Sequence, residues 1–183
     1  MPADTDIIYR VNAADQICFT NSQYDEFAVA NDGDAAHSAT VLNRPLWDFI
    51  GDPTTRHLYQ QVIERVREGR SIRFSFRCDS PTCRRQSELT VVPVEGGCVE
   101  FRTHTISEEE RPTPTLLQHH AGSSGQLLRM CAWCNLVEAN GAWVEIEEAA
   151  RRLQLFEHSR LPAITHGICE PCFVKMNRSL ADA

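Results

Sequence analysis

The chain has 183 residues, a formal net charge of −7 and a pI near 5.5, and 42% of its residues are hydrophobic. This length suits one ordinary domain with a small addition, or two small domains. Nucleic-acid binders usually show a basic footprint, so the acidic balance disfavours that class. No apolar run approaches the roughly 18–20 residues of a membrane-spanning helix, and the N-terminus shows no apolar signal segment. We therefore expect a cytoplasmic globular protein that binds neither membranes nor nucleic acids.

The first hundred residues open with a predicted β-hairpin. IIYRV (7–11) and QICFT (16–20) are apolar and rich in β-formers, and NAAD between them has turn composition. Asn21 or Ser22 then suits the N-cap of a short helix over YDEFAVAN.

A longer helix follows a loop. Asp52 precedes Pro53, which is the usual pairing of an N-cap with a proline in the first turn. The apolar stripe runs through Leu58 and Val62, and Gly69 is placed to end the helix as a C′ glycine.

Beyond Gly69 the apolar period changes from 3.6 to 2, which indicates strands. SIRFSFRC (71–78), SELTVVPV (87–94) and CVEFRTHT (98–105) are the three predicted strands, and Pro93 suggests an edge or a bulge. Five strands with helices inserted in the middle make an α+β layout with an antiparallel sheet.

This order of elements is similar to that of bacterial PAS-like sensory domains. LNRPLWDFIGDPTTRHLYQQVIERVREGRSIRFSFRCDSPTCRR resembles their helix-to-strand core, and YRVNAADQICFTNSQYDEFAVAN resembles their first hairpin and the helix after it. The resemblance covers roughly residues 6–106. It implies a sensor and dimerisation module that holds any small molecule between the sheet and the central helices.

By analogy, a ligand cavity has eight candidate lining residues, which are Phe27, Trp47, Phe49, Leu58, Tyr59, Phe74, Phe76 and Phe101. The alternative is that they form an ordinary core, since aromatic side chains are usually buried for packing. No cysteine lies between Cys18 and Cys78, which disfavours a covalent flavin photosensor. A haem ligand would have to come from His37 or His57. The sequence does not name a ligand.

Charged residues gather in RCDSPTCRR, between two predicted strands. Arg77, Asp79, Arg84 and Arg85 either bind an anion or form a charge network around a solvated turn. Cys78 and Cys83 lie in the same segment, and three alternatives are open for them: a redox pair, a soft-metal site, or inert thiols.

Composition divides the chain into three parts. Residues 1–106 form the PAS-like domain, residues 107–126 (SEEERPTPTLLQHHAGSSGQ) have linker composition, and residues 127–183 form a cysteine-rich module. The linker predicts that the two folded parts are independent, so that a Cys131→Ser substitution unfolds only the module.

The strongest motif is a pair of Cys-x-x-Cys turns, Cys131 with Cys134 and Cys169 with Cys172. Two such turns supply four sulfur ligands, which suits tetrahedral Zn²⁺. WVEIEEAARRLQLF between them has the pattern of an amphipathic helix that returns the second turn to the first. A piece this small holds little core, so a metal has a clear structural use.

Alternatives to a structural zinc site stay open at this point. His166 can replace one cysteine, lie behind a ligand, or be a plain turn residue. The thiols can instead form a redox switch, an oxidoreductase site or an iron–sulfur site. Neither pair is followed by histidine, so covalent c-type haem is disfavoured.

The tail also resembles a segment found at the ends of bacterial signalling proteins, which runs Cys-x-x-Cys, Trp, a short helix and His-Gly-Ile-Cys-x-x-Cys. Here the matching residues are CAWC, Trp143 and HGICEPC, over about residues 130–173. That segment usually has a basic residue after its first cysteine pair, where this chain has Asn135.

Together these features predict a non-enzymatic bacterial signalling protein: a PAS-like sensor joined to a Cys₄ zinc module. It would pass its signal through a homodimer or to a larger signalling protein. The alternative is a thiol-based redox sensor or oxidoreductase that uses the Cys-x-x-Cys pairs.

Overall fold

The computed structural model describes residues 5–31, 33–80, 82–111, 127–155 and 162–181. Most of the expected linker, residues 112–126, lies outside this range.

Five antiparallel strands form the larger sheet, as the sequence predicts. They are β1 (Ile7–Val11), β2 (Ile17–Thr20), β3 (Ile72–Arg77), β4 (Cys83–Val94) and β5 (Cys98–Glu110), in the order β2-β1-β5-β4-β3. The expected hairpin of β1 and β2 is present. The five-stranded antiparallel sheet with helices inserted between β2 and β3 is the layout that the PAS resemblance implies.

The inserted helices are α1 (Ser22–Ala30), α2 (Ser38–Val41) and α3 (Pro53–Arg67), with short 3₁₀ turns at 34–36 and 46–49. Asn21 caps α1 by accepting the Tyr24 N–H, and Asp52 caps α3 by accepting the Thr55 N–H. Gly69 has φ +95°, the left-handed conformation expected of a C′ glycine. The predicted boundaries of α3 are therefore confirmed.

Strands β4 and β5 are longer than the sequence pattern suggests. Their pairing extends to Cys83 opposite Glu110, so residues 107–110 continue the sheet instead of starting a linker. Pro93 pairs with Val99 on β5 but lies beyond the last β3 partner, Val91. Proline has no N–H to donate, and at this position there is no β3 residue that would need one.

The cysteine module has its own small sheet in the order β8-β7-β6-β9. The strands are β6 (Leu127–Cys131), β7 (Val137–Ala139), β8 (Ala142–Val144) and β9 (Ala163–Gly167), with β6 and β9 parallel. The helices are α5 (Ile146–Arg152) and α6 (Glu170–Ala181).

The helix predicted to begin at Trp143 is wrong at its start, because Trp143 belongs to β8 and α5 begins at Ile146. Asn140 and Gly141 both have positive φ, 53° and 79°. They make the tight turn that pairs β7 with β8, and an Asn-Gly pair is the strongest short hairpin signal in a sequence.

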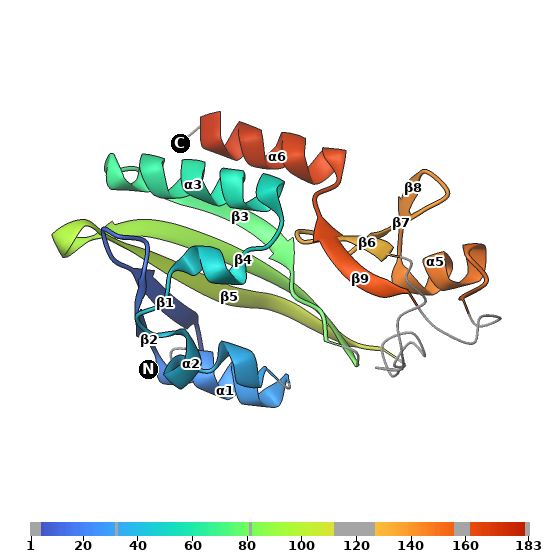
Figure 1. The fold of residues 1–183 in the computed structure, drawn as a ribbon, viewed down its shortest axis with the longest axis horizontal. Helices are drawn as coiled ribbons and strands as arrows, with labels where there is room; N and C mark the ends of the chain where they lie inside the picture. Colours follow the sequence, from blue (N-terminus) through green and yellow to red (C-terminus); the bar gives the residue numbers. More distant parts are fainter. Residues whose placement is uncertain (1–4, 32, 81, 112–126, 156–161, 182–183) are drawn as a thin grey trace.

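The two parts of the chain share one core. Figure 1 shows α6 lying beside α3, and α6 also contacts β3. Met176 and Leu180 of α6 are 2% and 1% exposed and belong to the same apolar cluster as Leu58 and Val62 of α3. The independence expected from the linker composition therefore conflicts with the packing. None of the helices in the described ranges has the length and apolar character needed to cross a membrane.

Candidate metal centre and ligand cavity

The four predicted cysteines come together. The sulfur atoms of Cys131, Cys134, Cys169 and Cys172 all lie within 4.8 Å of one another, and those of Cys134 and Cys169 are 3.7 Å apart. A zinc ion with Zn–S bonds of about 2.3 Å needs sulfur–sulfur edges of about 3.8 Å. The cluster therefore has the size and donor chemistry of a four-thiolate metal site.

The parallel pairing of β6 with β9 explains this convergence. Cys131 ends β6 opposite Gly167 at the end of β9, so the two Cys-x-x-Cys turns start at the same edge of the sheet. The Ala132 N–H donates to the Gly167 carbonyl at 2.8 Å and joins the turns directly.

Backbone donors converge on one sulfur. The N–H groups of Trp133 and Cys169 each lie 3.4 Å from the Cys131 sulfur. Asn135, with φ 56°, closes the first turn by donating its N–H to the Cys131 carbonyl. The position that is usually basic in the resembling segments thus serves here as a left-handed turn residue, a conformation that asparagine tolerates well.

Negative charge concentrates on Cys131. A hydrogen bond from the Cys134 thiol, helped by backbone N–H groups, lowers the pKa of Cys131 to about 4 against the effect of burial. The same hydrogen bond, with burial, raises the pKa of Cys134 well above its ordinary value. Burial raises the pKa of Cys172 to about 12. A cation is therefore needed to hold several of these sulfurs as thiolates together.

The four cysteines differ in exposure. Cys131 and Cys169 are 0% and 2% exposed, whereas Cys134 and Cys172 are partly exposed.

His166 lies outside the cluster. It is an exposed residue of β9 that pairs with Met130, and the group of potential ligands in the described residues contains the four cysteines without it.

Trp133, to which the sequence analysis gave no role, links the four-cysteine cluster to the larger sheet. It is 6% exposed, and its ring centroid lies 5.8 Å from that of Tyr59 on α3 and 5.7 Å from that of Phe74 on β3. Its carbonyl accepts the Arg77 N–H at 2.7 Å. The sequence did carry a signal for this contact. A Cys-x-x-Cys turn does not need a large aromatic residue between its cysteines, so a tryptophan there indicates a packing partner elsewhere in the chain.

The predicted ligand-lining residues separate into three groups. Leu58, Phe74 and Phe101 are buried core, and Tyr59 packs against that core while stacking on Phe101. Trp47 donates its indole N–H to Asp15, and Phe49 is 40% exposed beneath Arg44. Phe27 and Phe76 line a cavity beside α1.

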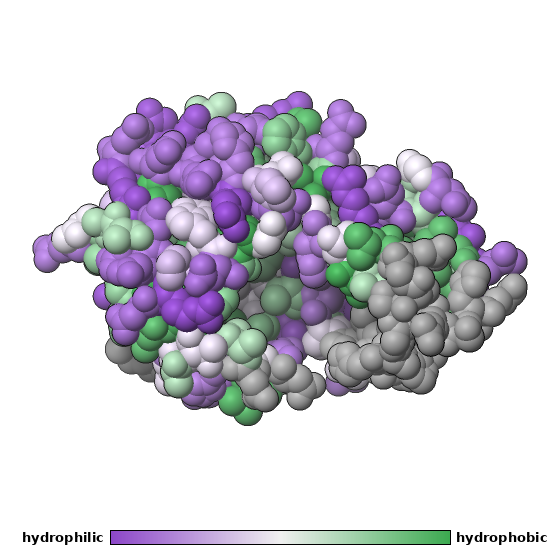
Figure 2. Space-filling view, in the orientation of Figure 1, coloured by the Kyte–Doolittle hydropathy of each residue, from purple (hydrophilic) through white to green (hydrophobic). Residues whose placement is uncertain are grey.

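That cavity has a volume of about 350 Å³ and lies between α1 and the sheet. Its described lining residues are mostly apolar and none of them is charged; they include Tyr9, Tyr24, Phe27, Phe76 and Thr103. Figure 2 shows this face of the molecule hollowed near its middle, with apolar side chains in the depth. Three of the predicted aromatic residues, Tyr59, Phe74 and Phe76, also line a smaller cavity of about 110 Å³.

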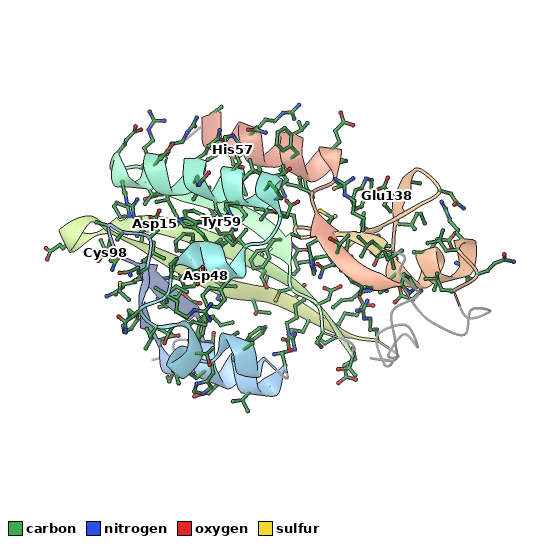
Figure 3. The ribbon with its side chains drawn as sticks, viewed as in Figure 1. Asp15, Asp48, His57, Tyr59, Cys98 and Glu138 are labelled. Carbon is green, nitrogen blue, oxygen red and sulfur yellow. The ribbon has the colours of Figure 1, made fainter. Side chains whose placement is uncertain are left out.

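Tyr59, labelled in Figure 3, projects from α3 toward the sheet. Burial raises its pKa to about 12, so its ring is a neutral part of the interior at neutral pH. The two histidines considered as haem ligands lie elsewhere: His57 is exposed beside Gln61, and His37 caps α2.

The arginine cluster is a charge network and extends into the module. Arg77 pairs with Asp79 and Glu145, and Arg84 lies 3.2 Å from Glu147. Burial works against the charge of Arg77, but its hydrogen bonds to Asp79 and Glu145 outweigh this and raise its pKa.

Two further arginines complete this network. Arg111, 8% exposed, reaches both Asp79 and Glu147. Arg85 pairs with Glu108 and lies over the Phe27 ring. These arginines therefore face carboxylates of the chain itself, which supports the network over an anion site.

The remaining cysteines stay outside the metal cluster of the described residues. Burial raises the pKa of Cys78, which lines the large cavity. The Cys83 sulfur contacts the Arg84 carbonyl, and the exposed Cys18 contacts the Arg10 carbonyl. Cys98, labelled in Figure 3, begins β5.

Comparison with known proteins gives fold neighbours only. No protein family matches the sequence, and no curated protein matches it either. Two solved structures from Haloarcula marismortui are similar to part of the chain. A domain of an HTR-like protein is 14% identical with a TM-score of 0.40, covering 56% of this chain and 99% of that one. A PAS domain of an HTR-like protein is 21% identical with a TM-score of 0.34, covering 55% and 81%.

Proposed function

We propose that the protein is a non-enzymatic, cytoplasmic PAS-like signalling protein whose C-terminal module holds a structural Zn²⁺ on four cysteines. The observation that carries the metal part is the convergence of four sulfurs within 4.8 Å at the joined ends of β6 and β9. The PAS-like part is supported by the five-stranded antiparallel sheet, its inserted helices and the apolar cavity against that sheet.

Zinc fits this donor set, because it accepts four sulfur ligands in tetrahedral geometry and has no redox chemistry of its own. Bound there, it would neutralise the thiolates and fix the two turns. The chain's own residues supply the rest: the N–H groups of Trp133 and Cys169 support the Cys131 sulfur. A signal would then leave by protein–protein contact, through a homodimer or a larger signalling protein.

The test is elemental analysis of the untagged chain purified without oxygen, with a UV–visible spectrum. We expect about one zinc per chain and no visible absorption. Cys169→Ser should lose the metal, while the matched variant Cys83→Ser, outside the cluster, should retain it. Iron with a visible band, or equal zinc in both variants, contradicts the proposal.

A further inference from the structure

We propose that Trp133 is a built-in occupant of the space between α3 and the larger sheet, held there by the metal site. Loss of the metal then withdraws it and opens that space to an uncharged aromatic ligand. The inference rests on the proposed metal site. It adds that binding of the metal decides whether a ligand cavity between α3 and the sheet is filled by Trp133 or open.

The first support is the position of the indole. Its ring joins a series of aromatic contacts that crosses the inner face of the sheet, from Tyr9 stacked on Phe101 at 4.6 Å, through Tyr59, to Trp133. The other three residues of this series come from the sheet and α3, whereas Trp133 comes from the module. The module thus inserts a side chain where the fold otherwise leaves room between helix and sheet.

The second support is the way Trp133 is held. It stands between Cys131 and Cys134, and its own N–H donates to the Cys131 sulfur. Its indole Nε1 is buried and finds no hydrogen-bond partner in the described part of the chain. The ring is therefore held by apolar contact and by the fixed turn, together with the backbone bond to Arg77. Without a cation, the β6–β9 pairing and the Ala132–Gly167 hydrogen bond still join the two turns, but the bonds from four sulfurs to one centre are lost and the first turn is less constrained.

The third support is the space beside the ring. A cavity of about 110 Å³ already adjoins it, lined by Thr55, Tyr59, Phe74, Phe76, Leu89, Ala132 and Trp133. None of these residues is charged, so the cavity favours an uncharged guest. Thr55 is 7% exposed, and its hydroxyl has no partner in the described residues, so it can bond one polar atom of that guest.

Phe76 also lines the cavity of about 350 Å³ next to α1. Departure of the indole enlarges the smaller cavity by the volume of that side chain, in the direction of Tyr59 and Phe74. An apolar cavity that cannot collapse stays empty and accepts aromatic guests. The ligand class is therefore a planar, uncharged aromatic molecule with one hydrogen-bonding group.

The first experiment follows Trp133 itself. The chain has three tryptophans, so the double variant Trp47→Phe, Trp143→Phe leaves Trp133 as the only one. We expect the zinc-loaded chain to emit at short wavelength and resist acrylamide quenching. After chelation, emission should move to longer wavelength and quenching should rise several-fold, with the β-sheet circular dichroism retained and zinc restoring the first state.

The second experiment uses indole, which has the shape of the departing side chain, and measures its binding by calorimetry. Zinc-loaded wild type should not bind indole, whereas the metal-free chain and zinc-loaded Trp133→Ala should bind it. Zinc-loaded Trp143→Ala is the matched control and should not. Zinc content is measured for each variant.

The outcomes are separable. A chain without zinc overturns the proposed function, and this inference falls with it. Zinc binding with Trp133 still protected after chelation, or with the sheet unfolded by chelation, overturns the inference alone. Zinc-loaded Trp133→Ala that does not bind indole contradicts the assigned ligand site.

Discussion

The larger sheet and the cysteine module bury their apolar residues in different ways. The sheet has a continuous core of its own, in which Val11, Val66, Val91 and Phe101 are fully buried. The module's separate cluster is small and includes Leu128, Val137, Ile146 and Leu155. Trp133, Met176 and Leu180 of the module are buried in the sheet's cluster instead. The module therefore depends for its stability on contact with the sheet and on its cysteines. The module in turn covers part of the apolar core of the sheet.

The largest expected effect tests whether this core is shared. Leu180→Ala in α6 removes a side chain that is 1% exposed, which costs about 2–5 kcal/mol in a packed core. Val174→Ala on the same helix, 41% exposed, should change stability by less than about 0.5 kcal/mol. Amide hydrogen exchange of β5 is the measurement, because a shared core requires faster exchange in the sheet. Unchanged β5 protection in Leu180→Ala would mean that the two parts unfold separately.

Local structure could be predicted well from the sequence where the conformation of a residue depends on its neighbours in the chain. Asp52, Pro53 and Gly69 define α3, and each Cys-x-x-Cys spacing predicts a turn that presents two sulfurs, because capping and knuckle geometry are local. The Asn140–Gly141 hairpin carried a local signal that the helical pattern of the following residues obscured.

The docking of the module could not be predicted in the same way. Trp133 meets Tyr59 and Phe74 across large sequence separations, and no spacing rule encodes such a contact. The same holds for Arg77 and Arg84, whose partners Glu145 and Glu147 lie in the module. The composition of the linker predicted that the two parts fold independently. Composition describes the connecting segment, but it carries no information about the surfaces of the two parts that pack together.

A smaller effect comes from the end of α3. Gly69→Val places a β-branched side chain at φ +95°, which costs about 1–2 kcal/mol. Gly51→Val is the matched control: an added Cβ meets no atom within 4 Å at either glycine, but Gly51 lacks the positive φ. It should be neutral or slightly stabilising. Urea unfolding measures both, and equal loss in the two variants contradicts the backbone explanation. If the core is shared, Gly69→Val should also lower the protection of α6 amides against hydrogen exchange.

The charge network between the two parts should contribute less. Glu147→Gln removes carboxylate contacts to Arg84 and Arg111, and Glu147 is 40% exposed, so we expect at most about 1 kcal/mol, decreasing with added salt. Glu148→Gln is the control, because Glu148 pairs with Arg151 and Arg152 within α5. Thermal unfolding at low and high salt compares them. A larger loss of thermal stability in Glu148→Gln than in Glu147→Gln would show that this network does not hold the module to the sheet.

The smallest expected effect lies on the opposite face of the sheet. Glu100 alternates with the inward Val99 and Phe101, so it faces away from Trp133, yet it is only 4% exposed. Burial raises its pKa, but hydrogen bonds from Arg102 and Arg10 outweigh burial, and the net pKa lies below its ordinary value of 4.5. A carboxylate with a lowered folded-state pKa stabilises the protein above its unfolded-state pKa, and this contribution disappears as pH falls through the folded value.

Wild type should therefore exceed Glu100→Gln in stability at pH 7, and the difference should close as the pH falls below about 4. Arg10→Gln, which removes one of the two partners, should flatten the acid limb part of the way. Urea unfolding between pH 3 and 7 measures the slope, and parallel curves for wild type and Glu100→Gln contradict the assignment. Because Glu100 and the module lie on opposite faces, the slope should be the same with zinc bound or removed. A slope that changes with zinc would show that the metal site reaches through the sheet, beyond the inner face where Trp133 lies.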